Sequence, residues 1–148
     1  MNIAILHYSV PPVVGGVESV IAHHARLMAA NGHSVRLIAG RGNALGEKIP
    51  LVEMPQADSQ HPRVLAVKEQ LDQGAVTAEF DSLRDDLVSQ LQTALSAVDI
   101  LIAHNVCSLN KNLALTAALQ KLQTATARKL PCLILWHHDL AWTTPRYL

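Results

Sequence analysis

Short apolar runs alternate along the chain with longer stretches in which an apolar residue recurs every three or four positions. The short runs are rich in β-branched residues and are bounded by turn residues, which is typical of buried strands. We expect strands in NIAILHY, HSVRLIAG, KIPLVEMP, VDILIAHN and PCLILWHH. We expect helices from Val17 to the Asn31-Gly32 pair, from about Arg63 to Asp72, from about Thr77 to Ala97, and from Leu113 to about Ala127.

This order of elements predicts the fold class. Strands that alternate with helices of ten or more residues need crossover connections, so the sheet should be mainly parallel and its crossovers right-handed. We therefore expect an α/β fold, a Rossmann-like doubly wound sheet flanked by helices. In such sheets ligands bind beyond the carboxyl ends of the strands, where the strand order reverses.

The first helix has a clear apolar side and a clear end. Its apolar side comprises Val17, Val20, Ile21, Leu27 and Met28. His24 falls among these positions, so we expect a histidine packed in the core. The adjacent His23 points about 100° away on a helix, so the pair cannot chelate one ion. Gly32 suits the left-handed position that follows a helix.

Composition narrows the class of protein. Of 148 residues, 49% are hydrophobic and 16% charged, and 12 basic residues balance 12 acidic ones. A net charge of zero argues against nucleic acid or a polybasic membrane contact as the main partner. Cys107 and Cys132 lie far apart in or beside apolar runs, which predicts buried free thiols in a reducing cytoplasm. The sequence shows neither a signal peptide nor an apolar run of membrane-spanning length.

Four histidines follow predicted strands: His7 after the first, His104 after the fourth, and His137 and His138 after the fifth. The carboxyl ends of parallel strands share one edge, so these side chains should lie near the ligand site. Asn105 and Asp139 add polar groups to the same edge. Histidine can exchange a proton near neutral pH or donate to a phosphate or a sugar hydroxyl. No H-x-x-x-H or C-x-x-C spacing supports a metal site.

The loop before the first helix contains two prolines followed by Gly15 and Gly16. Glycines there serve either a tight turn with positive φ or the close approach of a ligand to the backbone. The free N–H groups at the start of a helix suit an anion such as a phosphate. Glu18 falls in the first helical turn. The chain lacks G-x-G-x-x-G and G-K-[ST], which argues against a nicotinamide or flavin dinucleotide and against a P-loop.

The segment MNIAILHYSVPPVVGGVESVIAHHARLMAANGHSVRLIAG resembles the opening of the GT-B glycosyltransferases of glycosyltransferase family 4. Those proteins begin with a strand, a Pro-containing loop, a G-G-x-E element, a helix ending in GH, and a second strand. DILIAHNV and LPCLILWHHDLAW resemble the fourth and fifth strands of that family with their terminal histidines. The likeness is weakest from about Gly42 to Leu95.

The resemblance implies a retaining transfer of sugar from a nucleotide-diphosphate donor, with no obligatory metal and no cofactor. It implies that Gly15, Gly16 and Glu18 face the cleft with His104, Asn105 and Asp139, and contact substrate. A histidine after the fifth strand would contact the reacting sugar. If Trp136 is the aromatic residue before that histidine, His137 is the match, whereas a W-x-H-D pattern points to His138.

The chain stops about ten residues after the fifth predicted strand, with no helix to cover it. We therefore expect residues 1–148 to be the N-terminal, acceptor-side domain of a longer cytoplasmic protein, which could also work at the inner face of the membrane. The donor-side residues of the family belong to a second domain that this chain lacks, so the chain alone should be inactive. An exposed apolar surface there could also support a homodimer. The alternative is a stand-alone α/β module that binds a ligand or regulates without catalysis.

Overall fold

The computed structural model describes residues 1–124 and 131–143, and within them one parallel sheet of five strands. The strands are β1 (Asn2–His7), β2 (Ser34–Ala39), β3 (Leu51–Glu53), β4 (Ile100–His104) and β5 (Cys132–Trp136). Their order across the sheet is β3-β2-β1-β4-β5, and every neighbouring pair is parallel. The order reverses between β1 and β4.

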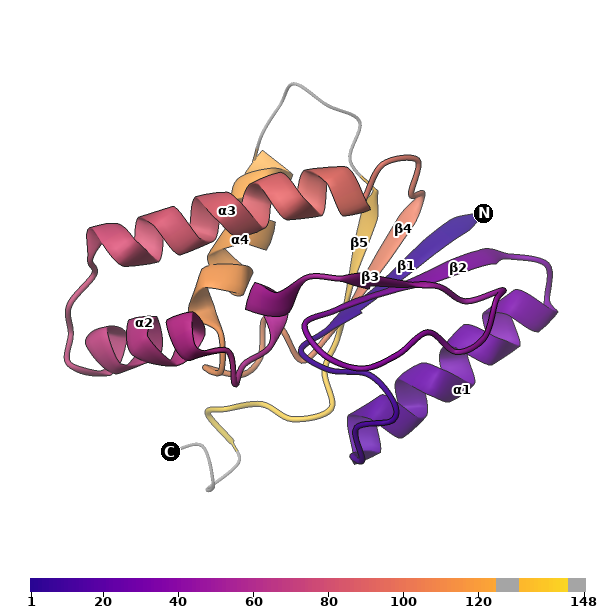
Figure 1. The fold of residues 1–148 in the computed structure, drawn as a ribbon, viewed down its shortest axis with the longest axis horizontal. Coiled ribbons are helices and arrows are strands. Elements are labelled where there is room, and N and C mark those ends of the chain that lie inside the picture. Colours follow the sequence, from indigo (N-terminus) through magenta and orange to yellow (C-terminus); the bar gives the residue numbers. More distant parts are fainter. Residues whose placement is uncertain (125–130, 144–148) are drawn as a thin grey trace.

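Helices cover both faces of the sheet (Figure 1). They are α1 (Gly16–Ala30), α2 (Pro62–Asp72), α3 (Ala78–Ala94) and α4 (Leu113–Thr124), with a short 3-10 helix at Pro55–Ala57. Helix α1 lies on one face, and α2, α3 and α4 lie on the other. The predicted Rossmann-like doubly wound fold is confirmed. The expected end of α4 near Ala127 falls outside the described residues.

Side-chain alternation along the strands divides the interior into two cores. On the α1 face, Ile3 and Ile5 of β1 pack with Val35 and Leu37 of β2 and with Ile21 of α1. The alternate residues of β1, β2 and β4 point to the opposite face of the sheet. These are Ala4, Leu6, Ile38, Leu101 and Ala103, which pack against the apolar sides of α2, α3 and α4. A one-residue shift in the register would exchange the two sets of residues, so both cores fix the register.

The helix ends follow from local chemistry. Gly32 has φ of 82° and donates to the carbonyl of Ala29, while His33 donates to that of Met28. This is the Schellman arrangement, and it confirms the predicted stop at Gly32. At the start of α3, the hydroxyl of Thr77 accepts from the Phe80 N–H at 3.4 Å. Helix α3 ends at Ala94, three residues before the expected Ala97.

Two expectations about burial are wrong. Leu27 was expected on the apolar side of α1, yet 61% of it is exposed, because Ile21, Ala22 and Ala25 form the buried stripe instead. Cys132 was expected to be buried but is exposed, because among the described strands β5 lies at the edge of the sheet and pairs with β4 alone. Cys107 is half-buried, and both thiols are free.

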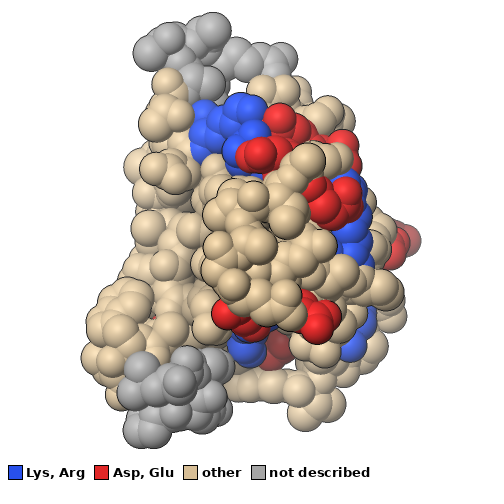
Figure 2. Space-filling view, turned by 90° about the vertical axis from the view of Figure 1, so that its left-hand side faces the viewer, with Lys and Arg blue, Asp and Glu red and all other residues tan. Residues whose placement is uncertain are grey.

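The surface has regions of mixed charge and an exposed apolar strand. In Figure 2, basic and acidic side chains lie next to one another rather than in patches of one sign. Arg63, for example, pairs with both Glu79 and Asp86 from α3. The edge strand β5, by contrast, exposes Ile134, Leu135 and Trp136. None of the helices in residues 1–124 and 131–143 combines the length and hydropathy needed to cross a membrane.

Candidate functional site

The strand-end histidines gather where the strand order reverses. His7 ends β1 and His104 ends β4, and these two strands are neighbours at the reversal. Trp136 ends β5 and is paired in register with His104. Because alternate residues share a face, His7, His104 and Trp136 all project to the α1 side at the carboxyl edge. This edge is the position at which doubly wound sheets bind ligands.

Three of the four predicted histidines are in contact. The Nδ1 atom of His7 lies 2.7 Å from the carbonyl oxygen of His104. The Nδ1 atom of His104 lies 2.9 Å from Nε2 of His138, and these two rings are nearly parallel, 23° apart in plane. His7 and His104 are buried, whereas His138 is exposed. A ligand at this edge can therefore reach His138 but not His104.

His137 stands apart from this group. It is exposed, and within the described residues its imidazole makes no hydrogen bond or ring contact. The two histidines that follow β5 thus differ in their surroundings, one held against His104 and the other in solvent.

Asn105 shapes the segment after β5. It adopts a left-handed conformation with φ of 57°, which asparagine tolerates better than most residues. Its side-chain Oδ1 accepts from the backbone N–H of His138 at 2.7 Å and from that of Asp139 at 3.2 Å. Asn105 is itself 1% exposed. It was expected to contact substrate, but it lies beneath the segment that carries His138 and holds that segment in place.

The Gly15-Gly16 loop differs from one of its two expected forms. Neither glycine has a positive φ; Gly15 is extended at −175°. A Cβ atom on Gly15 would lie 2.1 Å from Oε2 of Glu18, whereas one on Gly16 would meet nothing within 4 Å. A Cβ on Gly15 would thus require the flexible end of the Glu18 side chain to move, whereas Gly16 borders open space.

Glu18 connects the first turn of α1 to the loop just after β1. Its Oε1 accepts from the hydroxyl of Ser9 at 2.7 Å. A carboxylate in the first turn of α1 is favoured by the helix dipole. The same loop is hydrogen-bonded to the connection after β2. The N–H of Val10 donates to the carbonyl of Arg41, and the N–H of Asn43 donates to the carbonyl of Pro11. The loop is thus braced from both sides, and any anion that approaches α1 meets the carboxylate of Glu18.

We call the group formed by His7, His24, His104, Trp136 and His138 the histidine cluster. Two of its members, His24 and Trp136, were not expected there. His24 of α1 is half-buried, and its ring packs edge-on against Trp136 at 4.8 Å and lies 5.8 Å from the ring of His104. Its Nδ1 is buried without a hydrogen-bond partner among the described residues. Trp136 stacks on His104, with 42% of its surface exposed. The alternation of strand residues was the signal that could have placed Trp136 beside His104.

Burial governs the charge of the cluster. Burial above all, together with the neighbouring His138, His7 and His24, lowers the pKa of His104 to about 3. Burial also lowers the pKa of His7, against the opposing effect of its bond to the His104 carbonyl. The pKa of His138 is lowered by partial burial, while the charge of Asp139 raises it. These imidazoles are therefore neutral at pH 7.

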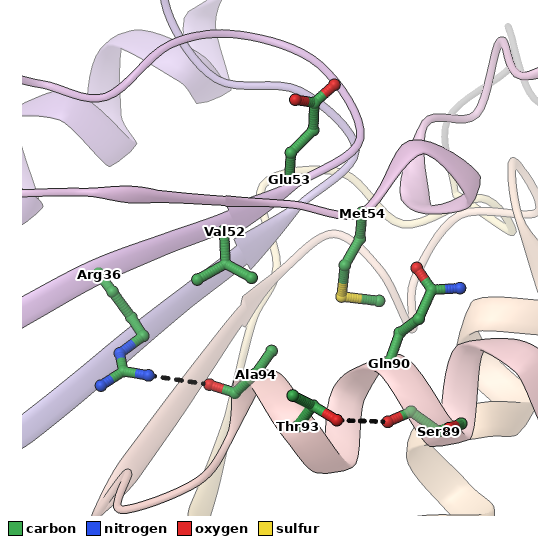
Figure 3. Close-up of a pocket in the computed structure, with 8 residues that line it drawn as sticks. All are labelled: Arg36, Val52, Glu53, Met54, Ser89, Gln90, Thr93 and Ala94. Carbon is green, nitrogen blue, oxygen red and sulfur yellow. Dashed lines mark hydrogen bonds between the residues drawn. The ribbon is translucent and has the colours of Figure 1, made fainter.

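The described residues contain no group of three or more His, Cys, Asp or Glu side chains placed to hold a metal ion. A separate recess of about 420 Å³ lies between β2, β3 and the C-terminal half of α3 (Figure 3). Val52 and Met54 point into it, and Arg36 crosses one end to donate to the carbonyl of Ala94 at 3.2 Å. It shares no residue with the histidine cluster.

Comparison with protein-family models and with curated proteins gave no match to this chain. The geometry at the carboxyl edge is therefore the main guide to function.

Proposed function

We propose that this chain is the acceptor-side part of a retaining glycosyltransferase that uses a nucleotide-diphosphate sugar and works in the cytoplasm. The single observation that carries the proposal is the exposed imidazole of His138, held over the reversal of strand order by His104 and Asn105. In the reaction, the bond from the anomeric carbon to the diphosphate breaks and a bond to an acceptor oxygen forms. The acceptor hydroxyl loses its proton, and the nucleoside diphosphate leaves.

The groups that reach solvent at this edge suit a sugar. His138 offers a ring nitrogen, and the carboxylate of Glu18 can accept from hydroxyl groups beside the open space at Gly16. The exposed face of Trp136 gives an apolar surface against which a sugar ring can lie. Convergent polar groups next to an apolar wall are typical of small-molecule sites. The likeness of the first forty residues to glycosyltransferase family 4 supports the same assignment.

The two histidines after β5 are not equal under this proposal. The contact with His104 gives His138 a defined orientation, and a catalytic group needs one. His137 has no such contact among the described residues. We therefore assign His138 to the reacting sugar and keep His137 as the alternative to be tested.

The test is a transfer assay on the protein that contains this chain. The purified protein is incubated with UDP-, GDP- and ADP-sugars, with and without a panel of saccharide and lipid acceptors, and products are followed by mass spectrometry. We expect release of a nucleoside diphosphate with one donor class. H138A should lower the rate at least about tenfold, as expected for the loss of a hydrogen bond of about 1.4 kcal/mol to the ligand. H33A, which changes a histidine at the opposite end of α1, should not.

Two results would count against the proposal. If the folded protein consumes none of the donors, the assignment as a glycosyltransferase loses its support. If it binds a saccharide but never consumes a donor, the chain is better described as a stand-alone ligand-binding module. Loss of activity in H137A with full activity in H138A would move the role to His137.

A further inference from the structure

His104 lies at the centre of the histidine cluster and is fully buried. It is 0% exposed at the end of β4, and its ring contacts those of Trp136 and His138. Its carbonyl oxygen is engaged by His7 and its Nδ1 by His138. A residue in this position cannot contact a ligand directly, so any role at the site must act through a neighbour.

The contact between His104 and His138 contains a single hydrogen. Burial keeps His104 neutral at pH 7, and the lowered pKa of His138 keeps that ring neutral as well. Each neutral imidazole carries one N–H and one lone pair. Nδ1 of His104 and Nε2 of His138, 2.9 Å apart, must therefore include one donor and one acceptor.

The second nitrogen of His104 decides which ring donates. Nε2 of His104 is buried and has no hydrogen-bond partner among the described residues. If His138 donated, His104 would carry its hydrogen on Nε2 as a buried N–H without an acceptor, a feature that folded proteins almost never retain. If His104 donates through Nδ1, only a lone pair is left without a partner at Nε2. The second arrangement is favoured.

We propose that His104 is a positioning residue whose Nδ1–H donates to Nε2 of His138 and holds His138 in the Nδ1–H tautomer. His138 then presents an N–H donor to a ligand oxygen at the carboxyl edge. The bond made by one ring nitrogen fixes the role of the other. The neutral Nδ1–H tautomer of His138 has no free lone pair with which to remove a proton. The identity of the ligand rests on the proposed function, but the tautomer does not.

The test reads the tautomer of each histidine directly. The chain is labelled with ¹⁵N at histidine, and two-bond proton–nitrogen spectra are recorded at about pH 8, above the ordinary histidine pKa of about 6.5. Two internal references lie in the same molecule. Nδ1 of His23 lies 2.7 Å from the carbonyl of Ser19 and must carry hydrogen, whereas Nδ1 of His61 accepts from the N–H of Arg63 at 3.2 Å and must not.

We expect His138 to show the pattern of His23. The pattern of His61, or an average of the two, would overturn the proposal from the unmodified chain alone. In H104F, which keeps an aromatic ring but removes the donor, His138 should move to the averaged pattern. An unchanged His138 signal in folded H104F would also overturn it. The spectra do not depend on sugar transfer, so this proposal and the proposed function can fail separately.

Discussion

The hydroxyl of Ser9 donates to Oε1 of Glu18 at 2.7 Å and thereby ties the loop just after β1 to the first turn of α1. The same carboxylate lies against Gly15, with Oε2 2.1 Å from the place where a Cβ would be. This relationship gives the two adjacent glycines different roles, which single substitutions can separate.

We predict that Gly15→Ala lowers the free energy of unfolding and that Gly16→Ala does not. A methyl group on Gly15 displaces the carboxylate end of Glu18, and the loss of its bond to Ser9 should remove about 1 kcal/mol, the usual net value of a hydrogen bond. A methyl group on Gly16 meets open space and should be neutral or stabilising by up to about 1 kcal/mol. Urea unfolding measures both. S9A is the control: its effect should not add to that of Gly15→Ala, and full additivity would contradict the mechanism.

His24→Leu should leave stability unchanged or raise it. The substitution removes a buried Nδ1 that has no partner among the described residues, and a leucine keeps the apolar contact with Trp136. His104→Leu should instead destabilise by about 0.5–1.5 kcal/mol, because it removes the hydrogen bond to His138. Thermal and urea unfolding of the pair test this. A larger loss of stability in His24→Leu than in His104→Leu would contradict this prediction and show that Nδ1 of His24 has a hydrogen-bond partner in solution.

Stability should depend both on the side chain of Asn105 and on its left-handed backbone. Asn105→Gly keeps the left-handed backbone but loses the acceptor for the His138 and Asp139 N–H groups, and should destabilise by about 1–3 kcal/mol. Asn105→Ala loses the acceptor and also strains the backbone, which should cost about 1 kcal/mol more. Urea unfolding of both variants gives the difference. Equal stabilities of the alanine and glycine variants would mean that the conformation at φ of 57° is not retained in solution.

Stability should fall as the pH is lowered from 7 towards 4. The folded-state pKa of His104 is about 3, below the unfolded value of 6.5, so between these values the unfolded chain binds a proton that the folded chain does not. The free energy of unfolding therefore rises with pH through this window, by up to about 1.4 kcal/mol per pH unit for one such group. The lowered pKa values of His7 and His138 act in the same direction.

Urea unfolding at several pH values between 4 and 8 measures this slope. His104→Phe should flatten it because the titrating ring is gone. His61→Phe, at the start of α2 and outside the cluster, is the matched control and should not. The same slope in His104→Phe and in the unmodified chain would show that His104 titrates normally in the folded state.

Much of the fold follows from the sequence, because periodicity and turn residues are local signals. The elements, the parallel sheet and the stop at Gly32 were all predicted from such patterns. The sequence did not predict burial at the edges of the structure. Leu27 and Cys132 are exposed because of which neighbours the fold supplies, and a residue's own side chain does not reveal that.

The gathering of the strand-end histidines at one edge was predictable, but their contacts were not. Strand ends placed His104 and His138 at one edge, yet only the three-dimensional packing shows that one is buried beneath the other. Gly15 illustrates the same limit, since its close neighbour proved to be the side chain of Glu18. Asn105 followed a strand end like a ligand-binding residue, but its left-handed backbone turned its amide towards the chain.

The most direct test of the central claim, that the carboxyl edge binds a sugar-bearing ligand, is a chemical-shift titration of the ¹⁵N-labelled chain with nucleotide sugars and saccharide acceptors. Backbone signals should change in residues 9–18, 104–108 and 137–143, around His138 and Glu18. Changes confined to the recess lined by Arg36 and Met54, or no change with any ligand of the panel, would contradict it.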